Sequence, residues 1–343
     1  MDASRLMAML QPLLASHEDL APSIYKLAQR LKGATNADLL LTEAEIIDRL
    51  ERAESNDFVP SWLRMLHSVG GDALHGRPLA RRINAILENP DYRREHKGTL
   101  LEGVYQDLAP FMSNVRSLLT SLESLGVSED EIPEGSCEIG VLFPPIEVKD
   151  LEDLAREIRE FDKHMRVISE LAGNAGSLSV RRVEKGSVNL FSLADPAVGS
   201  IVAALLAALV TLVKKVAEIR KIAAETRKIN VEVAEKLEQQ AVAARKAGIE
   251  DIAAQYVTRD VATQDPRRNE LDIALTHTIA YLDAKIQMNV VFEVRASASA
   301  EAAGEATETA LQVIRQSGNA LAEFSRSEWQ LLLARAVADK LGA

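Results

Sequence analysis

The chain has 343 residues, which is enough for two domains, each with its own core. Its aromatic content is only 4%, and the composition is rich in Ala, Leu, Val and Glu, which favours helices. The formal net charge of -11 disfavours general affinity for nucleic acid, because a polyanion repels an acidic protein. The single cysteine, Cys137, excludes an internal disulfide, and no basic start with an apolar core resembles a signal peptide, so we expect a cytoplasmic protein.

Residues 1–130 are predicted to form an all-helical bundle. Glycines such as Gly33 and the pair Gly70-Gly71 separate short segments with helical apolar spacing. The expected helices span 4–14, 17–31, 43–54, 60–68, 78–88 and 99–125. The apolar side chains expected inside this bundle are Ile24, Leu27, Leu31, Ile46, Leu50, Trp62, Leu66, Ile83 and Leu87.

The acidic segment 126–136, which contains Pro133 and Gly135, is the predicted domain boundary. A second domain is expected over 137–295, and two further helices within 296–343. Strands are predicted in this second domain from apolar side chains at period two, over 137–143, 178–183, 188–193 and 286–295.

Helix-start signals alternate with these strands. Asp150 is a candidate N-cap for the first helix, and Asp195-Pro196 caps the second with proline where its missing N–H costs nothing. The order strand, helix, hairpin, helix, strand is the split βαβ, or ferredoxin-like, arrangement. We therefore predict an α+β, predominantly helical protein in which an N-terminal helical bundle precedes a ferredoxin-like βαββαβ unit.

The second helix of this unit is followed by more chain than the arrangement needs, and we predict an antiparallel helical hairpin inserted at about 214–285. The uncharged segment 197–213 is roughly 25 Å long as a helix, about the width of a small sheet. Two arms of similar length follow, with a turn expected near Gly248. Each arm carries a narrow apolar stripe, as a coiled coil requires. The residues expected to pack the hairpin are Ile219, Ile222, Ile229, Val233, Leu237, Leu271, Leu275 and Leu282.

Two groups of basic residues are candidates for binding an anionic partner. One group lies on the predicted β-hairpin, the other at the start of the outgoing helical arm: Arg181, Arg182, Lys185, Lys214, Lys215, Arg220 and Lys221. Local positive charge in an acidic protein favours nucleic acid, a lipid surface or an acidic protein face. The alternative is an ordinary solvated flank of a helix. No aromatic side chains interleave with these charges, so base stacking is not supported.

Two constellations could carry chemistry, and each has a simpler structural interpretation. His67, Asp72 and His75 flank a pair of glycines, but their spacing matches no common metal-ligand pattern. Cys137 and His164 could form a nucleophile pair, although the acidic residue beside the cysteine would raise the thiol pKa. We expect no catalytic, cofactor or metal site, and we lean towards a protein that is not an enzyme.

We predict a non-enzymatic interaction or assembly protein that uses the helical hairpin and the helical bundle to bind a partner or to self-associate. Two alternatives stay open. The segment 197–213 could insert into a membrane, with Lys214-Lys215 at its cytoplasmic end, giving a peripheral or single-span protein. The basic groups could instead bind nucleic acid.

Overall fold

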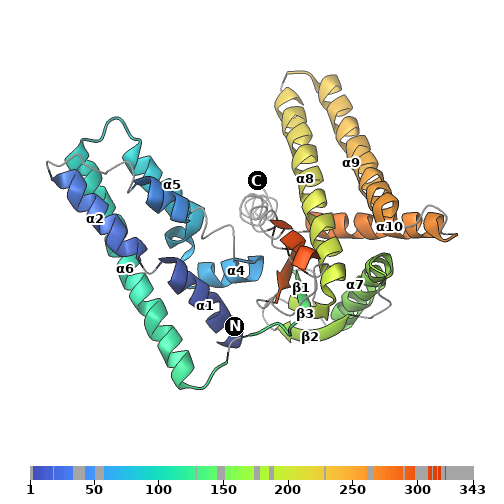
Figure 1. Ribbon diagram of the computed structural model, residues 1–343. Coiled ribbons are helices and arrows are strands. Elements are labelled where there is room, and N and C mark those ends of the chain that lie inside the picture. Colours follow the sequence, from blue (N-terminus) through green and yellow to red (C-terminus); the bar gives the residue numbers. More distant parts are fainter. Residues whose placement is uncertain are drawn as a thin grey trace. The chain divides into compact units, whose positions relative to one another are not determined.

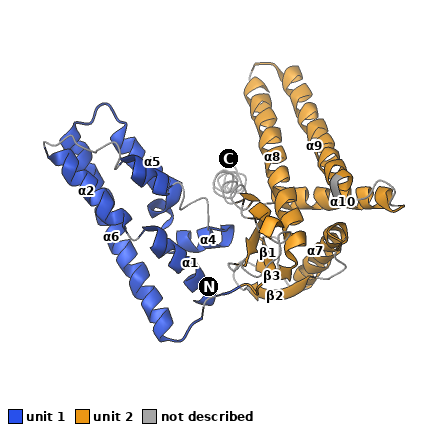
Figure 2. Ribbon diagram, in the orientation of Figure 1, with its two compact units in different colours: residues 1–131 blue, residues 132–343 orange. Residues whose placement is uncertain are grey.

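The computed structural model describes residues 3–17, 19–33, 43–50, 58–128, 130–144, 151–173, 178–184, 189–227, 229–260, 266–288, 290–297 and isolated positions between 308 and 321. The chain divides into two compact units, unit 1 at Met1–Glu131 and unit 2 at Ile132–Ala343 (Figure 2). This division falls inside the acidic segment 126–136. Helices predominate among the described residues, and a four-stranded antiparallel sheet lies in unit 2, so the protein is α+β and mostly helical.

Unit 1 is helical throughout its described elements. These are α1 (Ala3–His17), α2 (Leu20–Lys32), a helical segment at 43–50, α4 (Pro60–Ser68), the short 3-10 helix η1 (Asp72–Leu74), α5 (Gly76–Leu87) and α6 (Arg94–Ser124). The 31-residue α6 packs along both α2 and α1 (Figure 1). Most of the predicted core is buried, with at most 2% of each side chain exposed: Ile24, Leu27, Ile46, Leu50, Leu66 and Ile83.

The sheet of unit 2 consists of β1 (Cys137–Leu142), β2 (Ser179–Glu184), β3 (Asn189–Ala194) and β4 (Val291–Ala296). The strands lie in the order β2-β3-β1-β4, and every neighbouring pair is antiparallel. In the pairing of β1 with β4, Ile139 lies opposite Val294 and Val141 lies opposite Phe292. The chain therefore returns to the same sheet after the long helical excursion, as predicted, and the last strand pairs with the first.

The start of the last strand was predicted wrongly. β4 begins at Val291, whereas Ile286 belongs to helix α10 (Arg268–Gln287). Ile279, Leu282 and Ile286 are spaced by three and then four residues, as on one face of a helix. Ile286 also fits the period-two pattern of the strand. The helical period prevails because these side chains enter the same buried cluster, where Ile286 is only 6% exposed.

Helices α7 (Leu151–Leu171) and α8 (Pro196–Arg227) build the core of unit 2 together with the sheet. The alternating face of β1 that carries Cys137, Ile139 and Val141 is buried in one cluster with them. The backbone N–H of Ala197 donates to Oδ1 of Asp195 (2.8 Å), so Asp195 caps α8 as expected. A Cβ added at Gly199 would lie 2.3 Å from Sγ of Cys137, so glycine permits the close approach of α8 to β1.

A helical hairpin is present in this region, but its arms and its turn differ from those predicted. α8 continues from the sheet without interruption, and α9 (Val231–Asp260) runs back beside it (Figure 1). The chain turns at Ile229 and Asn230, where Oδ1 of Asn230 accepts a hydrogen bond from the N–H of Val233 (3.2 Å) and caps α9. Gly248, the predicted turn, lies inside α9. A Cβ there would lie 2.5 Å from Cδ1 of Leu212, so this glycine brings the two helices close together.

Small side chains form the seam between α8 and α9. Val216 and Ala223 on α8 are buried seven residues apart, and Ala234 and Ala241 on α9 are buried with the same spacing. Gly248 continues the second series by a further seven residues. A heptad repeat of this kind keeps one side of each helix on its neighbour, and the small side chains allow a close approach.

We expect Ala241→Leu to lower the free energy of unfolding of unit 2 by about 1–3 kcal/mol, because a buried seam has no room for three extra carbons. Ala241 is 0% exposed, whereas the adjacent Val242 is 60% exposed. Val242→Leu is therefore the matched control, with an expected change of at most about 0.5 kcal/mol. Chemical denaturation measures both, and equal changes in the two variants would show that the seam is wrongly assigned.

The predicted C-terminal helices at 300–316 and 319–341 lie largely outside the described residues. The described positions between 308 and 321 are helical. Ile314 and Leu321 join the core cluster of unit 2.

Candidate functional site

The histidine cluster near Gly70-Gly71 is not one site. Nδ1 of His67 and Oδ2 of Asp72 form an exposed pair (3.0 Å). His75 is instead fully buried, with its Nδ1 3.4 Å from Nε2 of His17 and its ring against Phe58. Burial lowers the pKa of His75 to about 3 and that of His17 to about 4, so both imidazoles are neutral parts of the core of unit 1.

Cys137 and His164 have separate structural roles. Burial raises the pKa of the Cys137 thiol to about 12, and the nearby Asp195 carboxylate adds to the rise. The thiol is therefore protonated and a poor nucleophile. His164 Nδ1 lies 3.1 Å from the Thr278 hydroxyl, and its ring stacks on Tyr281 with 4.2 Å between the centroids. Burial lowers the pKa of His164, and this side chain joins α7 to α10.

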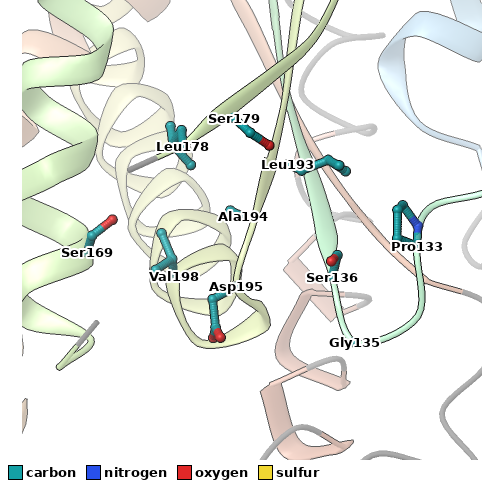
Figure 3. Close-up of a pocket in the computed structure, with 10 residues that line it drawn as sticks. All are labelled: Pro133, Gly135, Ser136, Ser169, Leu178, Ser179, Leu193, Ala194, Asp195 and Val198. Atoms are coloured by element: carbon teal, nitrogen blue, oxygen red, sulfur yellow. The ribbon is translucent and has the colours of Figure 1, made fainter. Parts of the chain in front are cut away.

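A hollow of about 370 Å³ lies in unit 2, where β3 leads into α8 (Figure 3). Its polar lining comes from Ser136, Ser169, Ser179 and Asp195 (Figure 3). The carboxylate of Asp195 caps α8, and the ten lining residues include no histidine or lysine that would activate a serine hydroxyl. Within the described ranges, no group of three or more His, Cys, Asp or Glu side chains is arranged to hold a metal ion.

The basic residues predicted on the β-hairpin are engaged within unit 2. Arg181 Nη1 donates to Oε2 of Glu138 (2.8 Å), and that carboxylate is 1% exposed. The Arg182 guanidinium lies 5.8 Å from the centre of the Phe191 ring. Lys185 lies outside the described residues. Both β-hairpin arginines thus have interaction partners within the sheet.

The basic residues of α8 lie on a different element. Lys214 is half-buried, whereas Lys215, Arg220 and Lys221 are exposed. Arg220 is 4.0 Å from the carboxylate of Glu238 on α9. These side chains border the hairpin, and they are not brought together with Arg181 and Arg182.

The segment predicted as a possible membrane span is the first half of α8. By length and composition α8 could cross a membrane, and 61% of its apolar window is buried within the protein. Val202, Leu205, Leu206 and Leu209 are each at most 1% exposed and belong to the core cluster of unit 2.

The residues predicted to pack the hairpin fall into two sets. Leu271, Leu275 and Leu282 on α10 are buried in the core of unit 2, not in the seam between α8 and α9. In the hairpin itself, Ile219 and Leu237 are half-buried, whereas three side chains are exposed: Ile222 by 53%, Val233 by 43% and Ile229 by 89%. The large apolar residues predicted for the seam thus lie beside it, because small residues occupy the seam.

These exposed side chains form one side of the hairpin. Ile222 immediately precedes the seam residue Ala223, and Val233 immediately precedes Ala234. Because consecutive residues of a helix are rotated by about 100°, each of these side chains points about 100° away from its seam residue. In two antiparallel helices packed along their seams, residues that precede a seam residue point to the same side of the pair. We call the part of this side nearest the turn the apolar flank; its members are Ile219, Ile222, Thr226, Val233 and Leu237. Farther from the turn the same side is polar, with Lys215 before the seam residue Val216 and Gln240 before Ala241. Val242, which follows the seam residue Ala241, lies on the opposite side.

Charged residues lie at the edges of the apolar flank, and one of them, Lys236, forms an ion pair with Glu232 on its own helix (2.8 Å). Glu218 and Glu225 follow seam residues of α8 by two positions, and Lys236 follows Ala234 by two. Each is thus turned by about 200° from its seam, at the outer edge of its helix. All three are exposed. The signal that identifies them is their spacing from the seam, which depends on knowing the position of the turn.

Comparison with known proteins gives no further assignment. No family model matches the chain, and no curated protein or solved structure matches it.

Proposed function

We propose that this protein is a non-enzymatic interaction or assembly protein, and that the α8–α9 hairpin is the element that binds its partner. The observation that carries the proposal is the exposure of Ile222, Ile229 and Val233 beside a seam that is already filled. Contiguous exposed apolar side chains cost free energy in water and commonly mark an interaction surface. The hairpin holds together without them, so they are available to a partner.

The arrangement of the sheet and helices in unit 2 favours a fixed attachment of the α8–α9 hairpin to the rest of the unit. We infer that unit 2 is a variant of the ferredoxin-like arrangement, in which α8 is extended and α9 and α10 are inserted before the last strand. The strand order β2-β3-β1-β4 with antiparallel neighbours favours this interpretation. The first half of α8 packs against the sheet, so the outer half is a continuation of a fixed helix.

Membrane insertion through 197–213 is a weaker candidate. Insertion would withdraw Leu205, Leu206 and Leu209 from the core, although all three are fully buried there. The apolar sheet face under α8 would then meet water, at a cost of about 25 cal/mol for each Å² exposed. Co-flotation of the full chain with anionic liposomes would favour this alternative, provided that the apolar segment became protected from protease.

A photo-crosslinking amino acid placed at position 222 or 242 in the full chain tests the proposed function in cells. Both native side chains are exposed to a similar extent, by 53% and 60%, but they lie on opposite sides of the hairpin. We expect a crosslinked protein product from position 222 and little from position 242. Equal yields at the two positions, or no product at position 222, would overturn the proposal.

A further inference from the structure

The hollow beside the start of α8 has the size and the lining of a binding site for a small molecule. Its volume of about 370 Å³ lies within the range of roughly 300–1,000 Å³ that ligand pockets span. Its walls combine the apolar side chains of Leu178, Leu193 and Val198 with hydroxyl groups and one carboxylate (Figure 3). We propose that this hollow binds a small primary amine, with the ammonium group at Asp195 and the apolar part of the ligand against these walls. The site lies at the opposite end of α8 from the hairpin turn, so the proposal does not depend on the proposed function.

The hollow contains a buried hydroxyl group that has no partner. Ser169 on α7 is only 3% exposed, and its oxygen points away from the α7 ribbon, on the side of Leu178 (Figure 3). A serine inside a helix commonly donates to a carbonyl three or four residues earlier, as Ser121 does to Ser117 (2.8 Å). Ser169 makes no such bond, and the described part of the chain gives it no other hydrogen-bond partner. Since buried polar groups are normally hydrogen-bonded, this hydroxyl is available to a molecule in the hollow.

The charge of the lining is negative. Asp195 is the one ionisable residue among the ten that line the hollow. Its Oδ1 accepts the N–H of Ala197 (2.8 Å), which holds the carboxylate at the N-terminus of α8, and no cationic side chain of the described ranges pairs with it. Glu134, which is exposed, lies between the lining residues Pro133 and Gly135 and adds a second negative charge nearby. An anionic ligand is therefore repelled here, and a cationic ligand is attracted.

An ammonium group matches this lining better than other cations do. It has three N–H donors and no acceptor, and the lining supplies acceptor oxygens from Asp195 and from the hydroxyls of Ser136 and Ser179. A hydrogen bond between an ammonium and a carboxylate is roughly twice as strong as a neutral one. A metal ion is disfavoured, because the described residues include no group of three or more His, Cys, Asp or Glu side chains placed to hold one. The apolar walls favour an amine that carries a short alkyl or aryl group.

Benzylamine, titrated into the purified full chain at neutral pH, tests the proposal. Benzyl alcohol and benzoate are the neutral and anionic analogues of similar shape, and the methyl chemical shifts of Leu178, Leu193 and Val198 report binding in the hollow. We expect benzylammonium to bind with a dissociation constant of roughly 0.1–1 mM, and at least about tenfold more tightly than either analogue. Equal affinities for the three compounds, a preference for an analogue, or unchanged methyl shifts at roughly 10 mM benzylamine would overturn the proposal.

Three variants test whether the amine lies at the named side chains. Asp195→Asn keeps an oxygen that can cap α8 but removes the charge, so it should weaken benzylammonium binding at least about fivefold and abolish the preference over benzyl alcohol. Ser169→Ala should weaken binding roughly two- to tenfold, the contribution of one hydrogen bond. Ser192→Ala is the matched control, because Ser192 is 2% exposed but lies outside the lining, and it should change the affinity less than about twofold. Binding that is unchanged in Asp195→Asn, or that Ser192→Ala weakens as much as Ser169→Ala does, contradicts this site.

Discussion

Replacing Arg245 by methionine is expected to lower the free energy of unfolding of unit 2 by about 3–5 kcal/mol, because it leaves a buried carboxylate without its cation. Arg245 on α9 forms an ion pair with Asp283 on α10, and the Asp283 side chain is 0% exposed. Nε2 of Gln287 also approaches this carboxylate, at 3.3 Å from Oδ2, but a neutral amide cannot replace the positive charge. Chemical denaturation of the native and variant chains measures the difference.

Two further variants determine whether the lone charge is the cause. The double substitution Arg245→Met with Asp283→Leu removes both charges and should recover most of the loss, since an apolar pair of similar volume is often as stable as a buried ion pair. Lys246→Met is the matched control, because the Lys246 side chain is 81% exposed and should change stability by at most about 0.5 kcal/mol. A loss below about 1 kcal/mol for Arg245→Met would show that Asp283 is not buried in solution.

Acidification from pH 7 to pH 5 is expected to destabilise unit 1 by about 3.5 kcal/mol through two histidines, at about 1.36 kcal/mol per pKa unit for each. Burial lowers the pKa of His17 to about 4 and of His75 to about 3. Their unfolded pKa is about 6.5, so below that value the unfolded chain binds protons that the folded unit does not. The stabilising contribution is complete above about pH 6.5, decreases progressively below it, and is fully lost only once the pH has fallen through about 4 for His17 and about 3 for His75.

Tryptophan fluorescence makes this prediction specific to unit 1. The chain has two tryptophans, and replacing Trp329 by phenylalanine leaves Trp62, which lies against Phe58 in the same core region as His75. In this background, His17→Gln with His75→Gln should remove most of the slope of stability against pH. His67→Gln is the control, because the His67 side chain is 77% exposed. An unchanged slope in the double variant would mean that other groups control the acid response.

The strands and helices that form the sheet region of unit 2 could be predicted because strand alternation and helix caps are signals local to the sequence. Period-two alternation marks β1 and β4, the cap at Asp195 marks the start of α8, and Gly173, with a φ of 71°, follows the end of α7. The sequence alone does not place the start of the last strand, because Ile286 satisfies the helical and the strand period together. Only the tertiary cluster around α10 decides between them.

The hairpin turn could not be placed from glycine and proline alone. The chain turns at Ile229 and Asn230 without either residue, and the informative signal is the capping side chain of Asn230. Gly248 misled the prediction, because a glycine can serve a close helix contact as well as a turn. With the turn at Ile229 and Asn230, Ala234 and Ala241 face α8 and form the seam, whereas Ile222 is exposed.

The most direct test of the central claim is to measure the stability of Ile222→Glu and its association with the protein that crosslinks at position 222, in the same preparation. If Ile222 serves a partner and not the fold, the variant should unfold within about 0.5 kcal/mol of the native chain while losing its association. If the variant instead loses more than about 1.5 kcal/mol of stability and still associates, Ile222 is a structural residue and the hairpin is not the interaction element.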